Sequence, residues 1–112
     1  MKKNLPSAIQ AVLRSVLGPR GESDIHQRQA VHDFARHACG TETAPSAVPT
    51  TLAPFIEKLT HSPYKIVERD LDELRQAGYS EDQIFELTLA GALGAAAGRY
   101  QRTLELLEDE NT

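Results

Sequence analysis

The stretch "LTLAGALGAAAG", residues 87–98, decides how the last helix of this chain packs. It contains no charged residue, and it places Gly91, Gly94 and Gly98 within a segment that otherwise has the composition of a helix. Each glycine costs about 0.5–1 kcal/mol relative to alanine in a helix interior. That cost is expected where a second helix must approach closely, so the question is which helix lies against the glycines.

The last helix is expected to cover about residues 81–108 and to be apolar on two opposite sides. At about 100° per residue, the large face consists of Phe85, Leu89, Leu93, Tyr100, Leu104 and Leu107. The small face consists of Ile84, Leu87, Gly91, Gly94 and Gly98. A helix that is apolar on both sides is buried on both sides.

We predict that the large face packs within the chain and that the small face meets a second subunit. The protein would then be a homo-oligomer, with a dimer favoured as the commonest closed form. Its contact would use Leu87, Gly91, Gly94 and Gly98, since small residues let two helices come close together. The alternative is that the glycines accommodate a helix of the same chain.

Composition limits the classes of function. The chain has 112 residues, of which 40% are hydrophobic and 25% charged, as in an ordinary soluble domain. Its net charge of -4 argues against a general nucleic-acid or anionic-membrane surface, because both partners require a basic face. No apolar run reaches the roughly 18 residues that a membrane span needs. The single cysteine, Cys39, fits a reducing compartment, so we expect a cytoplasmic protein.

The pattern of apolar residues predicts an all-α fold. No useful length alternates apolar and polar residues as a half-buried strand does, whereas helical spacing recurs over residues 9–17, 24–39, 51–60, 67–77 and 81–108. Gly18, Gly40 and Gly78 are expected stops. Asp24 with Gln27 and Ser80 with Gln83 are expected capping boxes.

We expect these five helices to form a single domain, residues 1–112, with three parts. Residues 1–61 hold the N-terminal helices and a linker rich in proline, serine and threonine. Residues 62–108 form a C-terminal helical hairpin, and residues 109–112 form an acidic, frayed tail.

The hairpin carries a family resemblance. Its sequence, "SPYKIVERDLDELRQAGYSEDQIFELTLAGALGAAAGRY", resembles the helical hairpin of the alkylhydroperoxidase D-like superfamily, which includes carboxymuconolactone decarboxylase. The landmarks are a helix that ends in Ala77-Gly78, the cap "YSEDQIFEL" and a helix rich in alanine and glycine. The resemblance implies an all-α oligomer, and it does not extend to the N-terminal half.

The peroxidase members of that superfamily carry a Cys-x-x-Cys-x-x-x-His motif. Its positions fall at or near Pro63, Ile66 and Asp70 of this chain, and none of these residues matches. A catalytic disulfide needs two thiols, and Cys39 has no second cysteine to pair with. The resemblance therefore implies a non-peroxidase member without a cofactor.

Two polar clusters are candidates for a site. The stretch "HSPYK" lies where the pocket of the family would open, and His61, Tyr64 and Lys65, with Asp70 nearby, could supply an acid or base and an anion clamp. The alternative is a loop that faces water. A second cluster on one helix flank, His26, Asp33 and His37, has spacing that could hold a metal, but its distance from the apolar face favours a solvated flank, so we predict no metal.

Three functions are left open by these observations. The first is a non-peroxidase member of the superfamily with unknown or degenerate chemistry. The second is a non-catalytic helical interaction or regulatory module. The third is a small lyase or isomerase that acts on a carboxylated metabolite. A polar pocket lined by His61, Tyr64 or Lys65 would favour the enzyme and a small-molecule ligand, whereas a dry, filled interface would favour the module.

Overall fold

The computed structural model describes residues 6–39 and 48–110. Within these residues the chain forms five α-helices and one short 3-10 turn, and no strand. The elements are α1 (Ser7–Val16), α2 (Ile25–Ala38), α3 (Ala53–His61), η1 (Pro63–Lys65), α4 (Glu68–Gln76) and α5 (Glu81–Glu110). The predicted all-α class is therefore confirmed.

Local signals set most of the helix ends. At the start of α5, Ser80 and Gln83 form the predicted capping box: the Ser80 backbone N–H donates to Gln83 Oε1 (2.9 Å), and the Gln83 N–H donates to Ser80 Oγ (3.1 Å). Gly78 ends α4 with a φ of 103°, a conformation that favours glycine. The helix continues to Glu110, so it includes the first two residues of the predicted tail.

The capping box predicted for α2 is only half present. The Asp24 side chain accepts from the His26 N–H (2.8 Å), as an N-cap does. Gln27 does not close the box, because its side chain instead donates to the Tyr79 hydroxyl at 3.0 Å. The predicted stop at Gly40 and most of the predicted linker lie outside the described residues.

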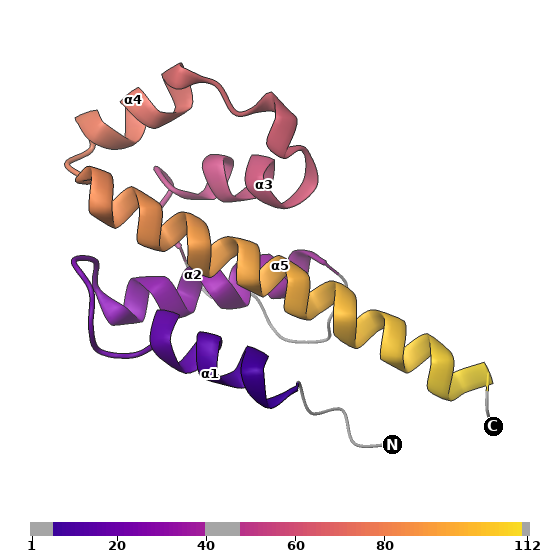
Figure 1. The fold of residues 1–112 in the computed structure, drawn as a ribbon. Helices are drawn as coiled ribbons and strands as arrows, with labels where there is room; N and C mark the ends of the chain where they lie inside the picture. The colour runs from indigo at the N-terminus through magenta and orange to yellow at the C-terminus, as the bar shows by residue number, and fades with distance from the viewer. Residues whose placement is uncertain (1–5, 40–47, 111–112) are drawn as a thin grey trace.

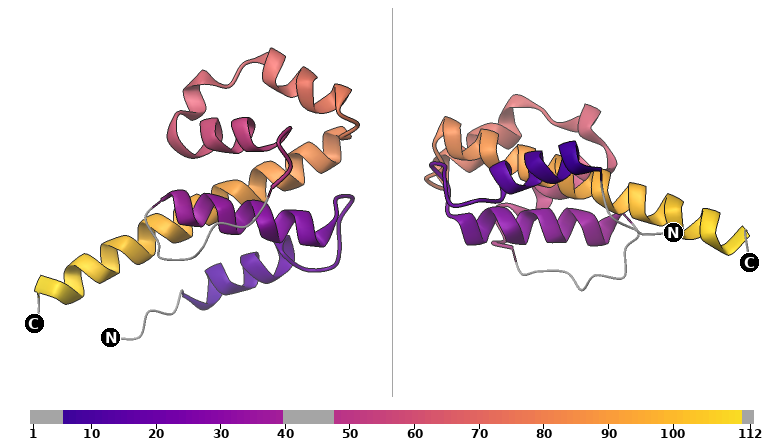
Figure 2. Two further views of the ribbon diagram at one scale, coloured as in Figure 1. Left: turned by 180° about the vertical axis from the view of Figure 1, so that it is seen from behind. Right: turned by 60° about the horizontal axis from the view of Figure 1, so that its bottom comes forward.

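The long helix α5 is the element on which the others assemble. At 30 residues it is about 45 Å long, and its C-terminal part extends past the other helices (Figure 1). In the two opposite views, α2 lies against one side of α5, α1 flanks it on a second side, and α3 and α4 lie on a third (Figures 1 and 2). Among the helices of the described residues, none lies over the side of α5 opposite α2 (Figures 1 and 2).

The small face of α5 packs against α2 of the same chain. A Cβ atom on Gly94 would lie 2.2 Å from the His32 carbonyl oxygen, and one on Gly98 would lie 2.5 Å from the Arg36 carbonyl oxygen. Both distances are far below van der Waals contact, so only glycine allows the α2 backbone to come this near. The prediction that the glycines meet a second subunit is therefore wrong, since α2 already occupies this face.

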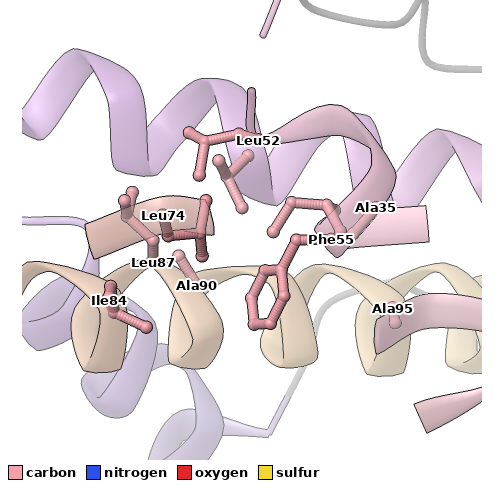
Figure 3. Packing of buried hydrophobic residues seen from close by; sticks show 10 residues of the cluster. Ala35, Leu52, Phe55, Leu74, Ile84, Leu87, Ala90 and Ala95 are labelled. Carbon is pink, nitrogen blue, oxygen red and sulfur yellow. The ribbon is translucent and has the colours of Figure 1, made fainter. Parts of the chain in front are cut away.

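The core lies between α5, α2 and α3 (Figure 3). Leu87, the fourth residue predicted to lie at a subunit contact, is buried in it. The other buried apolar side chains of this cluster are Val31, Ala35, Leu52, Phe55, Ile56, Leu74, Ile84, Ala90 and Ala95. The small residues of α5 thus meet large residues of the shorter helices, and this interlocking explains why the small face turns inward.

Most of the large face of α5 is exposed, and only Leu93 and Leu104 are half-buried, which corrects the prediction that this face packs within the chain. Phe85 is 67% exposed, and Leu89, Tyr100 and Leu107 are exposed as well. The helix nearest this face, α1, has only ten residues and buries none of them. Ile9 and Val12 of α1 also keep more than two fifths of their surface in contact with solvent. One short helix cannot cover a face that runs the length of α5.

Candidate functional site

The residues predicted to form a polar pocket lie on the outside of the molecule. His61, Tyr64 and Lys65 are all exposed, and Tyr64 is 82% exposed. The Lys65 ammonium lies 6.0 Å from the centre of the Tyr64 ring, a cation–π contact at the surface. Small-molecule sites are concave and mostly apolar, so this arrangement matches the alternative of a loop that faces water.

Asp70 acts as a structural carboxylate. It accepts from Lys58 Nζ (2.9 Å) and from the Val67 backbone N–H (2.9 Å), and so closes the first turn of α4. The hydrogen bond from Lys58, followed by the one from Val67, holds the pKa of this carboxyl below its usual range. The charge of Asp70 therefore joins α3 to α4.

The cluster predicted on α2 is not gathered around a common point. His26 and His37 are exposed, whereas Asp33 lies with one oxygen 3.5 Å from Nδ1 of its neighbour His32. Across residues 6–39 and 48–110, no three His, Cys, Asp or Glu side chains come together in a way that could hold a metal ion.

A partly buried polar clasp joins the α1–α2 loop to α5. The Glu86 carboxylate accepts from the backbone N–H of Glu22 (2.8 Å), from the backbone N–H of Ser23 (2.9 Å) and from Ser23 Oγ (2.7 Å). Arg28 is only 2% exposed, and its Nη1 donates to the carbonyl oxygens of Val16 (2.6 Å) and Arg20 (2.9 Å). The clasp anchors the C-terminal end of α1.

The carboxylate of this clasp is held in its charged form. Desolvation, the largest single influence, would raise the pKa of Glu86, but the hydrogen bonds from Glu22 and Ser23 and the nearby Arg28 charge together lower it. The Arg28 Nε lies 3.9 Å from Glu86 Oε1. Sequence reasoning missed this clasp because no local pattern connects Arg28 on α2 with Glu86 on α5.

An apolar groove opens between α1 and α5. Its volume is about 210 Å³. Its walls are formed by Pro6, Ile9, Leu13, Leu93, Ala96, Ala97 and Tyr100. The phenol of Tyr100 is the only polar side-chain group in this lining. A groove of this composition is suited to binding an apolar group, and it offers no pair of acid and base for catalysis.

A second groove, of about 290 Å³, lies where α1 joins the loop that follows it. It is lined by Arg14, Ser15, Gly18, Pro19 and Arg20. Its two arginines make it basic, and the guanidinium of the buried Arg28 does not line it.

The exposed apolar surface around the first groove is called here the α1–α5 face. It consists of Ile9, Val12 and Leu13 from α1 and of Phe85, Leu89, Ala92, Leu93, Ala96, Tyr100 and Leu107 from α5. The clasp holds one edge of this face in place, because Arg28 binds the carbonyl oxygens of Val16 and Arg20 at the C-terminal end of α1.

Comparisons with family models, with curated proteins and with solved structures found no match. The resemblance of residues 62–100 to the alkylhydroperoxidase D-like superfamily therefore stays a prediction. The hairpin of α4 and α5 has the expected order, but capped helical hairpins occur in many folds, so the hairpin alone does not assign a family. Among the helices of the described residues, none has the length and apolar character needed to cross a membrane.

Proposed function

We propose that this protein is a helical interaction module that binds an amphipathic helix on its α1–α5 face. The observation that carries the proposal is the exposure of the large apolar side of α5 beside an apolar groove. Contiguous apolar patches on a protein surface mark sites of interaction, whereas single exposed apolar residues do not. Phe85 and Leu89 lie one turn apart, so their exposure forms a patch.

The spacing along α5 supports a helix as the occupant. Phe85, Leu89, Ala92 and Ala96 follow one another at intervals of four, three and four residues. This alternation is the pattern by which one helix packs its side chains into the spaces of another. The two alanines leave room for close approach in the middle of the patch, and the groove beside them accepts a larger side chain.

The enzymatic alternatives receive less support. A non-peroxidase enzyme of the superfamily, or a lyase or isomerase, needs an acid or base in a pocket that excludes water. His61, Tyr64 and Lys65 face solvent, and Asp70 is engaged by Lys58. The groove between α1 and α5 contributes only the phenol of Tyr100. Binding of an apolar helix on the α1–α5 face requires no acid or base.

The proposal is tested with a designed helix as the probe. A fluorescein-labelled peptide of 21 residues, with leucine at the a and d positions and alternating glutamate and lysine elsewhere, is titrated with the protein and followed by anisotropy. We expect binding to wild type and at least tenfold weaker binding to Phe85→Ser. Glu73→Ser is the matched control, because Glu73 is exposed on α4, away from the α1–α5 face. Equal binding by all three proteins, or no binding, would contradict the proposal.

A further inference from the structure

We infer that the helix that covers the α1–α5 face is α5 of a second copy, which lies antiparallel to the first about a two-fold axis. This inference rests on the proposed function and names its partner. It differs from the glycine contact predicted from sequence, because it uses the opposite side of α5. Three features of the face, in size, shape and charge, fit a copy of itself.

The first feature is complementarity in size along α5. Along the centre of the seam, the N-terminal half carries the large residues Phe85 and Leu89 and the C-terminal half carries Ala92 and Ala96, while Leu93 and Tyr100 lie to one side, in the groove beside α1. In an antiparallel pair with its axis between positions 90 and 91, position 85 lies opposite position 96, and position 89 lies opposite position 92. Phe85 and Leu89 then each meet an alanine of the partner, as packing without voids requires.

The second feature is a knob and a matching groove on one face. Phe85 is the knob, since two thirds of its surface is exposed. Ala96, which would lie opposite Phe85, forms part of the wall of the 210 Å³ groove. A cavity of about 150 Å³ is enough to hold a benzene molecule, so the groove has room for the ring. A two-fold pair makes this contact twice, with the same residues each time.

The third feature is charge. Glu81 and Arg99 are 18 residues apart, which is five helical turns, so they lie on the same flank of α5. In the pair described here, Glu81 of each copy approaches Arg99 of the other. Within one chain Glu81 is bound only at the surface, by Arg75, and Arg99 donates to the Thr60 carbonyl oxygen (2.6 Å) while the residue stays exposed.

The size of the face suits a weak but specific dimer. From Glu81 to Arg99 the seam on α5 is about 27 Å long and about 10 Å wide, and α1, with ten residues, adds about 15 Å by 10 Å beside it. About 420 Å² would be covered on each copy, or roughly 840 Å² in total. Because stable, specific interfaces bury upward of about 1,000 Å², this dimer is expected to be weak, with association at high micromolar concentrations.

The register is tested by cross-linking in a Cys39→Ser background. One copy carries Phe85→Cys and the other carries Ala96→Cys, and the two are mixed under mild oxidation. Each mixed pair brings the two thiols together at one contact and keeps an intact Phe85–Ala96 contact at the other. We expect a disulfide-linked dimer in the mixture, formed at least tenfold faster than in either single-variant sample or in a Glu73→Cys control.

The outcomes separate this inference from the proposed function. A cross-link that forms equally well in the Phe85→Cys sample alone would indicate a parallel pair and would overturn the antiparallel arrangement. No cross-link, with wild type monomeric by sedimentation at about 200 μM, would overturn self-association. If the designed peptide still binds the face, the interaction module stands and only its partner is wrong. If the peptide fails too, both proposals are wrong.

Discussion

The contact between Gly94 and the backbone of α2 makes a sharp prediction about stability. A Cβ atom at Gly94 would lie 2.2 Å from the His32 carbonyl oxygen and 2.9 Å from its carbonyl carbon. These are backbone atoms, so no side chain can rotate away, and α2 must shift by roughly 1 Å. Overpacking of this kind costs about 1–3 kcal/mol. The helix propensity of alanine offsets about 0.5–1 kcal/mol of that cost.

We therefore expect Gly94→Ala to lower the free energy of unfolding by about 1–2 kcal/mol, equivalent to a Tm lower by about 4–8 °C. Gly91→Ala is the matched control on the same helix. A Cβ atom there would meet only side-chain ends, Leu59 Cδ2 at 3.0 Å and Val31 Cγ1 at 3.4 Å, which can adjust. Since the gain in helix propensity is the same, Gly91→Ala should lie within about 0.5 kcal/mol of wild type.

The measurement is urea unfolding followed by far-UV circular dichroism, with the m-value checked for constancy. Both variants should keep the helicity of wild type in buffer. The reasoning fails if Gly94→Ala is as stable as wild type, or if Gly91→Ala loses as much stability as Gly94→Ala. Either result would mean that α2 does not lie at the distance described.

Three further predictions concern titration, the clasp and the thiol. Burial, opposed by the hydrogen bond that His32 donates to Asp33, lowers the pKa of His32 from about 6.5. As the pH falls, His32 therefore binds a proton in the unfolded chain at a higher pH than in the folded chain. The free energy of unfolding is highest above about pH 6.5 and falls as the pH drops below that value. In His32→Leu, the free energy of unfolding measured by urea titration should depend less on pH between pH 7.5 and 5.5. An unchanged dependence on pH would contradict this role of His32. Glu86→Gln should cost about 1.5–3 kcal/mol, because charged hydrogen bonds to the loop are weakened. The exposed control Glu81→Gln should lower the free energy of unfolding by under about 1 kcal/mol. Equal losses in the two variants would contradict a stabilising role for the clasp. Wild type and Cys39→Ser should both fail to turn over an organic hydroperoxide with a dithiol donor, since one thiol cannot close a catalytic disulfide; turnover by either protein would contradict this.

The positions of the helices could be predicted from sequence because their signals are local. Ser80 and Gln83 cap α5 by contacts within one turn, and Gly78 ends α4 through its own backbone conformation. The spacing of apolar residues within α2 likewise predicts that this segment is a helix. Such signals act between residues a few positions apart, so a single sequence carries them.

The candidate site could be predicted less well, because its residues meet only in the folded chain. Arg28 and Glu86 lie on different helices, and what joins them is the path of the loop between α1 and α2. The stretch "HSPYK" has the residue types of a site, yet the fold leaves His61, Tyr64 and Lys65 in solvent. Residue type indicates possible chemistry, whereas concavity arises from how helices pack.

The sequence by itself determined that α5 has two apolar sides, one small and one large. Only the tertiary structure decided that the small side faces inward. The physical reason is distance: Gly94 and Gly98 let the backbone of α2 approach α5 more closely than any side chain would permit, and the large residues of α2 and α3 fill the remaining space. With that side occupied, α1 is too short to cover the other, and most of the large side of α5 stays exposed.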